Sequence, residues 1–173
     1  MATATLQITG LFEALDNAAD ELVQLITSID IRKINLVPFK ESWTAAQLIV
    51  HVTKSNKAIA QALHMEGELA IRDIDKGIAG LKKMFLDFDI KYKSPQFIIP
   101  EEGNYNKDEI IESLKRSVER LQDARSKHNL SEVIILPPFG EITKLELLHF
   151  VLYHTLRHIH QLKNIIYFLQ FKH

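Results

Sequence analysis

Two of the eight histidines in this 173-residue chain have a spacing that could bind a metal ion. His154 and His158 are four residues apart, so on a helix their imidazole rings lie about one turn apart on the same face. Random placement of the histidines would give roughly 0.4 such pairs, so the spacing says little by itself. Two imidazoles buried in a core need partners, because burying a polar group without a hydrogen bond is costly. A divalent metal bound by both rings would satisfy them, and hydrogen bonds to neighbouring core groups are the structural alternative.

The period of the surrounding apolar residues indicates which histidines point inward. On a helical projection, His154 and His158 lie in the middle of the apolar stripe of their helix, whereas His149 and His160 point to the opposite side. A third histidine, His51, lies on the inward face of another predicted helix. The histidine-rich segment therefore divides into an inward pair and two outward residues, and His51 becomes a candidate partner of the inward pair.

A helical bundle brings the inward faces of its helices together, so His51, His154 and His158 could form one site. Three neutral imidazoles leave a fourth coordination position open for water or substrate, which is typical of a catalytic rather than a structural metal site. Gln47 and Ser55 lie one turn before and one turn after His51, where either could hydrogen-bond to a ligand. A helix-boundary role for Gln47 and a packing role for Ser55 are the simpler interpretations.

Long helices are needed to position these histidines, and the apolar period predicts four of them. They extend approximately over residues 5–29, 44–65, 106–128 and 143–171. A shorter helix or a pair of turns is expected over residues 68–88, where Gly77 and Gly80 weaken the helical pattern. Because no segment has a convincing strand pattern, the sequence favours an all-α fold. We expect a single domain over residues 1–173, an antiparallel four-helix bundle with one longer crossover.

Composition and charge exclude several classes of function. Lys and Arg number 21 against 22 Asp and Glu, so no strong positive field exists to attract nucleic acid. The chain contains no cysteine, which excludes disulfides, thiolate metal ligands and a cysteine nucleophile. No apolar run approaches the ~20 residues that span a membrane, and residues 1–12 do not have the pattern of a signal peptide. We therefore expect a cytoplasmic protein with no membrane or nucleic-acid partner.

Short motifs follow one another in a distinctive order along the chain. Trp43-Thr44 is followed by Gln47 and His51, then by PFGEIT at 138–143, and finally by HTLRHIHQL at 154–162. Over nearly the whole chain this order resembles the DinB/YfiT-like superfamily of metal-dependent enzymes. The family commonly has a small residue before the glutamine of the last motif, and this chain has a histidine there. That histidine lies outside the predicted inward face, so we do not place it among the metal ligands.

The resemblance implies both a fold and a metal site. It implies a four-helix bundle with a long crossover, often dimeric, and a divalent metal ion, nickel or zinc, as cofactor. The positions of this chain that match the family's ligands are His51, His154 and His158, the three that the helical projection selects. The family also includes thiol-dependent transferases and isomerases that use low-molecular-weight thiols. Because this chain has no cysteine, any thiol in its chemistry must come from outside.

We therefore expect a metal-dependent enzyme that acts on a small molecule, either a thiol-dependent S-transferase or a hydrolase, and that forms a homodimer. A metal ion with an open position can lower the pKa of bound water and polarise a carbonyl, which supports hydrolysis. A general base would also be needed, and the first helix offers four unranked candidates: Glu13, Asp16, Asp20 and Glu21. The alternatives are a non-catalytic metal- or ligand-binding bundle, such as a stress-related accessory protein, and a purely structural dimer.

Overall fold

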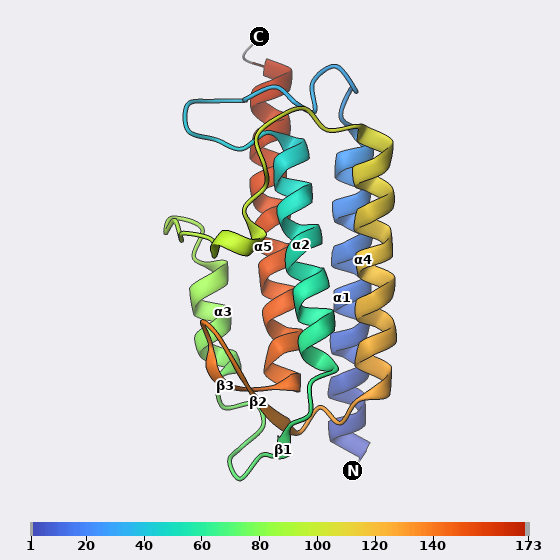
Figure 1. The fold of residues 1–173 in the computed structure, drawn as a ribbon, viewed down its shortest axis with the longest axis vertical. Helices are drawn as coiled ribbons and strands as arrows, with labels where there is room; N and C mark the ends of the chain where they lie inside the picture. The colour runs from blue at the N-terminus through green and yellow to red at the C-terminus, as the bar shows by residue number, and fades with distance from the viewer. Residues whose placement is uncertain (1, 172–173) are drawn as a thin grey trace.

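Four long helices pack side by side along the long axis of the molecule (Figure 1). The computed structural model describes residues 2–171, and the side chains of residues 8–170. Its helices are α1 (Ala2–Ser28), α2 (Ala45–Leu63), α3 (Ile78–Leu86), α4 (Lys107–Lys127) and α5 (Lys144–Phe171), with a short 3₁₀ helix η1 (Gln96–Ile98). The bounds of the four long helices and the short helix within 68–88 agree with the sequence prediction to within a few residues.

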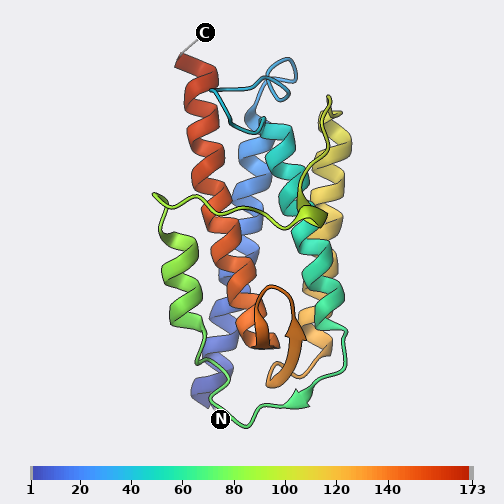
Figure 2. The same ribbon diagram turned by 60° about the vertical axis from the view of Figure 1, so that its left-hand side comes forward.

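The four long helices form two parallel pairs that run in opposite directions. α1 and α5 run one way, whereas α2 and α4 run the other way (Figures 1 and 2). Since α2 packs on α4 and both run in the same direction, the chain must return along the whole bundle between them. Residues 64–106, which include α3 and η1, make this return. The predicted bundle with a longer crossover is therefore confirmed.

Side-chain caps explain where three of the helices begin. At the start of α2, the Gln47 amide donates to Thr44 Oγ1 (3.1 Å), and the Thr44 amide donates to Gln47 Oε1 (3.0 Å). Asn106 accepts from two amides in the first turn of α4. Thr143 and Glu146 repeat the reciprocal arrangement at the start of α5. These bonds satisfy amides that have no partner within the helix, so the sequence fixes each helix start locally.

A small antiparallel sheet corrects the all-α prediction. It contains β1 (Glu68–Leu69), β2 (Glu132–Leu136) and β3 (Gly140–Thr143), in the order β1-β2-β3. β2 and β3 form a hairpin around Pro137 and Pro138, and Gly140 has a φ of +72° that favours glycine. Ile134 and Ile142 lie opposite each other and are buried under the bundle end. The strands were missed because they are too short to show a clear alternation, although β2 is rich in β-branched residues.

The apolar stripes of the four long helices meet in a continuous core. Leu22, Leu48, Leu114 and Leu162 come one from each long helix and are almost completely buried. Burial of each such side chain stabilises the fold by roughly 1.5–3 kcal/mol. In the part of the chain that the structure describes, no helix is long and apolar enough to cross a membrane.

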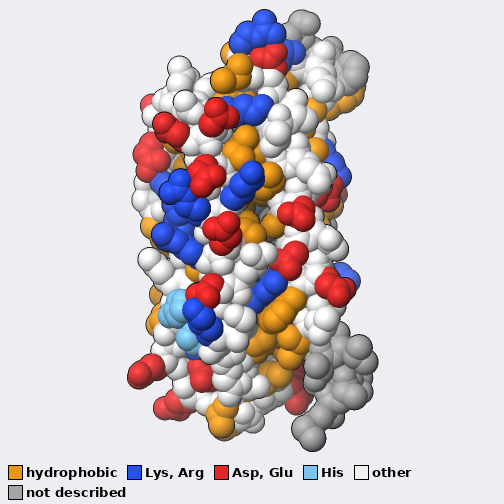
Figure 3. Space-filling model, turned by 90° about the vertical axis from the view of Figure 1, so that its right-hand side faces the viewer, with side chains coloured by type: hydrophobic (Ala, Val, Ile, Leu, Met, Phe, Trp, Pro, Cys, Tyr) orange, Lys and Arg blue, Asp and Glu red, His pale blue; other side chains and the backbone are white. Residues whose placement is uncertain are grey.

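The outer face of α1 and α4 carries charges of both signs. Acidic and basic side chains are interspersed over this face, with apolar groups between them (Figure 3). Two of the ion pairs on α4 join residues four apart: Arg116 with Glu112 (3.0 Å) and Lys127 with Asp123 (2.6 Å). Such exposed pairs contribute little to stability, and the mixed signs are those of a solvated helix surface.

Candidate metal centre

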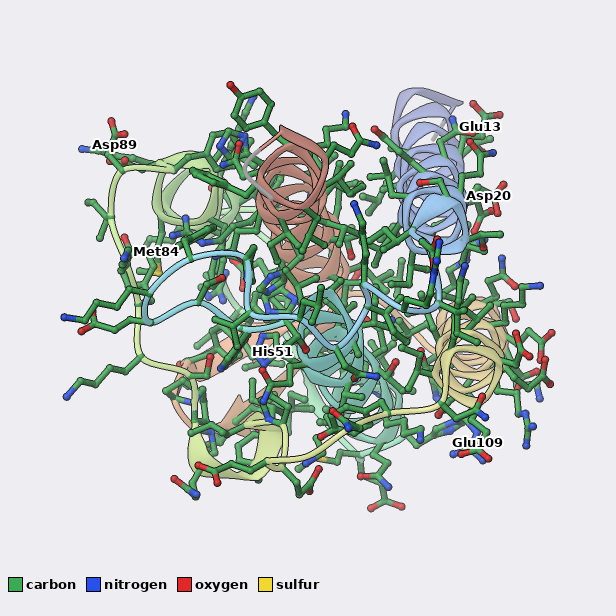
Figure 4. The ribbon with its side chains drawn as sticks, turned by 90° about the horizontal axis from the view of Figure 1, so that it is seen from above. Glu13, Asp20, His51, Met84, Asp89 and Glu109 are labelled. Atoms are coloured by element: carbon green, nitrogen blue, oxygen red, sulfur yellow. The ribbon has the colours of Figure 1, made fainter. Side chains whose placement is uncertain are left out.

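Three histidine rings from two helices converge inside the bundle. His51 comes from α2 and points into the interior (Figure 4), and His154 and His158 come from α5. His154 Nε2 lies 3.2 Å from His51 Nε2 and 3.0 Å from His158 Nε2. Ligating atoms of the three rings all lie within 4.8 Å of one another, and the residues are only 2–5% exposed. The structure thus brings together the three residues that the sequence selected, in an arrangement that could hold a metal ion.

The hydrogen bonds on the far side of two rings set their protonation. His51 Nδ1 lies 3.0 Å from the carbonyl oxygen of Ile98, and His158 Nδ1 lies 2.6 Å from Gln161 Oε1. Both partners are acceptors, so each Nδ1 carries the proton and, in a neutral ring, each Nε2 is a bare lone pair. Both lone pairs face His154 Nε2, which can donate at most one proton. At least one buried lone pair therefore has no donor within the cluster, and a cation between the rings would satisfy all three.

Burial keeps the three imidazoles neutral. Loss of solvent is the largest effect and lowers the pKa of His154 far below its usual value, with further lowering from His158, His51 and Arg157. The same loss of solvent, followed by the charge of His51, lowers the pKa of His158 to about 3. The pKa of His51 is also lowered, mainly by burial. Near neutral pH the rings are therefore uncharged, which is the form that coordinates a metal ion.

Aromatic side chains form the walls around the three histidines. The Trp43 ring lies 4.9 Å from that of His51, centroid to centroid. The rings of Phe150 and Phe85 lie 5.1 Å and 6.1 Å from that of His154. Such walls exclude water and lower the local dielectric constant, so charges placed at the site interact more strongly than in solution.

The segment between α3 and α4, residues 87–106, crosses over α5 and α2 (Figure 2), and its residue Ile98 contacts His51. Arg157, the residue before His158, holds one end of it. Its guanidinium donates to the carbonyl oxygens of Phe85 (3.3 Å), Asp87 (2.7 Å) and Ile90. These bonds fix the start of the segment beside the part of α5 that carries His154 and His158.

The structure gives a role to Gln47 but not to Ser55, the two residues considered as hydrogen-bond partners of the histidines. The side chain of Gln47 takes part in the α2 cap described above, which is the helix-boundary role. Ser55 is buried on α2 one turn after His51, and its contribution to a metal site stays a prediction. The groups that contact the outer nitrogens are instead Ile98 and Gln161.

Sequence reasoning could have found one of these two partners. Gln161 stands three residues after His158, so the spacing brings its amide beside the ring on the same helix face. The Ile98 carbonyl lies 47 residues from His51 in a loop, and a backbone oxygen leaves no trace in the residue types.

The histidines that the projection placed outside do lie away from the cluster. His160 stacks on Phe88, with ring centroids 4.1 Å apart and planes inclined by 4°. His149 lies beside Tyr153, with ring centroids 5.8 Å apart. Tyr153 lies on the outward side of the helical projection, but it is buried. The projection failed for Tyr153 because α3 packs against α5 and covers part of its outer face.

The first helix supplies no general base to the site. Asp16 is paired with Arg125 (2.9 Å), and Glu21 is paired with Lys163 (2.6 Å). Glu13 and Asp20 project from the outer side of α1, far from His51 (Figure 4). None of the four acids takes part in the three-histidine cluster. The sequence could not show that these four acids lie away from the histidines, because the rotation of α1 relative to α5 depends on packing.

Comparison with known proteins agrees with this architecture. A family model described as the DinB superfamily matches residues 14–162. The structure is similar to a crystal structure of TT2238, a four-helix bundle protein, with a TM-score of 0.61 and 17% sequence identity. That alignment covers 90% of this chain and 98% of the other, and at this identity it shows the fold alone. No curated protein matches the sequence.

Proposed function

The chain belongs to the DinB superfamily, and from that premise we propose that His51, His154 and His158 hold one divalent metal ion, nickel or zinc. The observation that supports this most strongly is the convergence of three buried Nε2 atoms. At most one of these atoms carries a proton, so hydrogen bonds among them cannot satisfy every lone pair. Ile98 and Gln161 would orient two of the ligands, as acceptors behind metal-bound histidines usually do. We further propose that the protein is cytoplasmic and forms a homodimer.

The proposed activity is that of a metal-dependent enzyme acting on a small molecule. Three protein ligands leave one coordination position of the metal ion open for an exogenous ligand. A metal ion held by the three histidines would act as a Lewis acid for water, a thiol or a carbonyl bound at that position. The aromatic walls would exclude bulk water from the bound molecule. The ring bonds to Ile98 and Gln161 would keep the Nδ1 protons of His51 and His158 in place throughout.

Between the two candidate reactions, the surroundings favour thiol-dependent transfer over hydrolysis. Hydrolysis is faster with a general base beside the attacking water, and the cluster of possible ligands contains no carboxylate. A thiol needs less help, because a thiolate is already a strong nucleophile once its pKa is lowered. The thiol would be a separate low-molecular-weight molecule, since the chain has no cysteine.

Metal content tests the site directly. We expect about one tightly bound nickel or zinc ion per chain by mass spectrometry of untagged protein, as proposed for a three-ligand site. His51→Ala and His158→Ala should each lose it. His160→Ala is the matched control, because His160 is on α5 close to His158 but stacks on Phe88 outside the cluster. Absence of metal in the wild type after incubation with both ions would overturn the proposal.

The burial of the site favours one alternative, a non-catalytic metal- or ligand-binding bundle such as a stress-related accessory protein. The three histidines are only 2–5% exposed, and Ile98 in the segment 87–106 contacts His51. Titration of the nickel-loaded protein with a small thiol separates the two functions. A thiolate-to-metal absorption band supports an open position and the transferase. An unchanged spectrum with metal still bound supports the non-catalytic bundle.

A further inference from the structure

A second pair of histidines meets at one end of the bundle, remote from the metal centre. His64 is the C-cap of α2 and His128 is the C-cap of α4. His128 Nε2 lies 2.7 Å from His64 Nδ1, and the ring centroids are 4.6 Å apart with planes inclined by 88°. His64 stands thirteen positions after His51 along α2, which places the pair about 20 Å along the helix from the three-histidine cluster.

The position of the pair at two helix ends favours a cation. α2 and α4 run in the same direction, so their C-terminal ends lie at the same end of the molecule (Figure 1). Each helix C-terminus carries a partial negative charge from its aligned peptide dipoles and unpaired carbonyls. The two negative ends therefore meet where His64 and His128 project, and a positive ion between the rings would be stabilised by both.

The two rings are also accessible and available as ligands. His64 is exposed and His128 is half-buried, so an ion can reach them without any opening of the bundle. Partial burial, followed by the charges of Lys144 and His64, lowers the pKa of His128, which keeps its ring neutral near pH 7. Glu132, which is paired with Lys144 (2.5 Å), acts in the other direction and raises the pKa of His128, whereas the charge of Lys127 lowers it further.

We propose that His64 and His128 form a second, surface metal site for a late first-row divalent ion such as Ni²⁺, Cu²⁺ or Zn²⁺. Imidazole suits these ions, and water would complete the coordination. Two nitrogens bound to one ion at about 2.0–2.1 Å in a tetrahedron lie roughly 3.3 Å apart. The rings need to separate by only a few tenths of an ångström, which exposed side chains can do. A bound ion would join the ends of α2 and α4.

Calorimetric titration with Ni²⁺ alone tests this site separately from the buried one. In wild-type protein we expect a second, weaker binding event after the buried site is filled. His64→Gln and His128→Gln should each weaken that event roughly hundredfold, because one imidazole loses the effective concentration supplied by its neighbour. Both variants should retain the tight event. His160→Gln is the control, since its ring stacks on Phe88 rather than on a histidine, and it should keep both.

The outcomes distinguish this site from the proposed function. Loss of the weak event in the two end variants, with the tight event intact, supports the surface site whether or not the protein is an enzyme. His158→Ala should instead remove the tight event and leave the weak event intact. A weak event of unchanged affinity in His64→Gln, with native helicity by circular dichroism, would overturn the surface site and leave His64 and His128 as a hydrogen-bonded pair only.

Discussion

His51 and Ile98 are joined by a 3.0 Å hydrogen bond that links the three-histidine cluster to the segment 87–106. The bond runs from the ring Nδ1 to the backbone carbonyl in η1, within the segment 87–106. Lys54, one turn after His51 on α2, donates to the next carbonyl, that of Ile99 (2.9 Å). The orientation of the His51 ring and the placement of this segment therefore depend on each other.

Replacing Arg157 should loosen that segment. Arg157→Ala removes the donors to three backbone carbonyls, and leaving such groups unpaired costs about 1–3 kcal/mol. We expect trypsin to cut at Lys91 and Lys93 roughly ten times faster than in the wild type, since cleavage follows the population of the open segment. Mass spectrometry of the early fragments would identify these sites. Arg116→Ala, which breaks an exposed pair on α4, is the control, and equal rates in both variants would contradict the role of Arg157.

Removing the amide of Gln161 should weaken metal binding without removing a ligand. Gln161→Leu leaves His158 Nδ1 without its acceptor, so the ring no longer has a fixed tautomer or orientation. Loss of such a partner typically costs 10–100-fold in metal affinity, which competition with a chromophoric chelator would measure. Asn164→Leu is the matched control, because it removes an amide that contacts His160 on the same helix. Equal affinities of the two variants would place Gln161 outside the site.

The convergence of the three histidines was predictable from the sequence, because helical period determines which residues of a helix share a face. His154 and His158 need only the geometry of one helix, and His51 needs only the assumption that inward faces meet. The starts of the helices were also predictable from local sequence, because the side chains of Thr44 and Asn106 accept hydrogen bonds from amides within the next turn of chain.

The rest depended on contacts between distant segments. Ile98 contributes a backbone oxygen from a loop, and Tyr153 is buried by α3, which its own helix period cannot reveal. The hairpin of β2 and β3 was missed because strands of four or five residues show too few alternations. His64 and His128 meet because α2 and α4 are parallel, a property of the crossover rather than of either helix.

A substitution of Gln47 tests whether this residue, one turn before His51, contributes to the stability of the fold or to metal affinity. Gln47→Ala removes half of the reciprocal cap at the start of α2, and we expect a loss of about 1 kcal/mol in the free energy of unfolding. Metal affinity should stay unchanged, because the amide contacts Thr44 rather than a histidine. Urea denaturation and chelator competition on the same samples would separate the two effects. A tenfold loss of affinity would instead support Gln47 as a partner of the metal ligands.

Glu146 should make stability depend on pH in the acidic range. Its buried carboxylate accepts from Arg72 (2.6 and 2.8 Å) and from the amides of Gly77 (2.6 Å) and Thr143 (2.8 Å). Burial alone would raise the pKa of Glu146, but the bonds to Arg72, Thr143 and Gly77 outweigh it and hold the pKa below 4.5. Because the folded-state pKa lies below the unfolded one, this stabilisation is complete above pH 4.5 and is lost as the pH falls through the folded value.

Glu146→Gln should therefore destabilise the protein strongly at pH 7 and much less in acid. Breaking this pair leaves Arg72 charged without its partner, but the Arg72 side chain is 25% exposed, so the cost is about 1–3 kcal/mol. Urea unfolding at a series of pH values gives the free energies of unfolding of the wild type and the variant. The difference between these free energies should narrow below pH 4.5, the ordinary pKa of a glutamate side chain, because the pKa of Glu146 in the fold is lower than that value. Glu112→Gln, which breaks an exposed pair with Arg116, should change stability by less than about 1 kcal/mol at any pH. A gap of constant size across the series would show that the capping geometry, rather than the charge of Glu146, stabilises the start of α5.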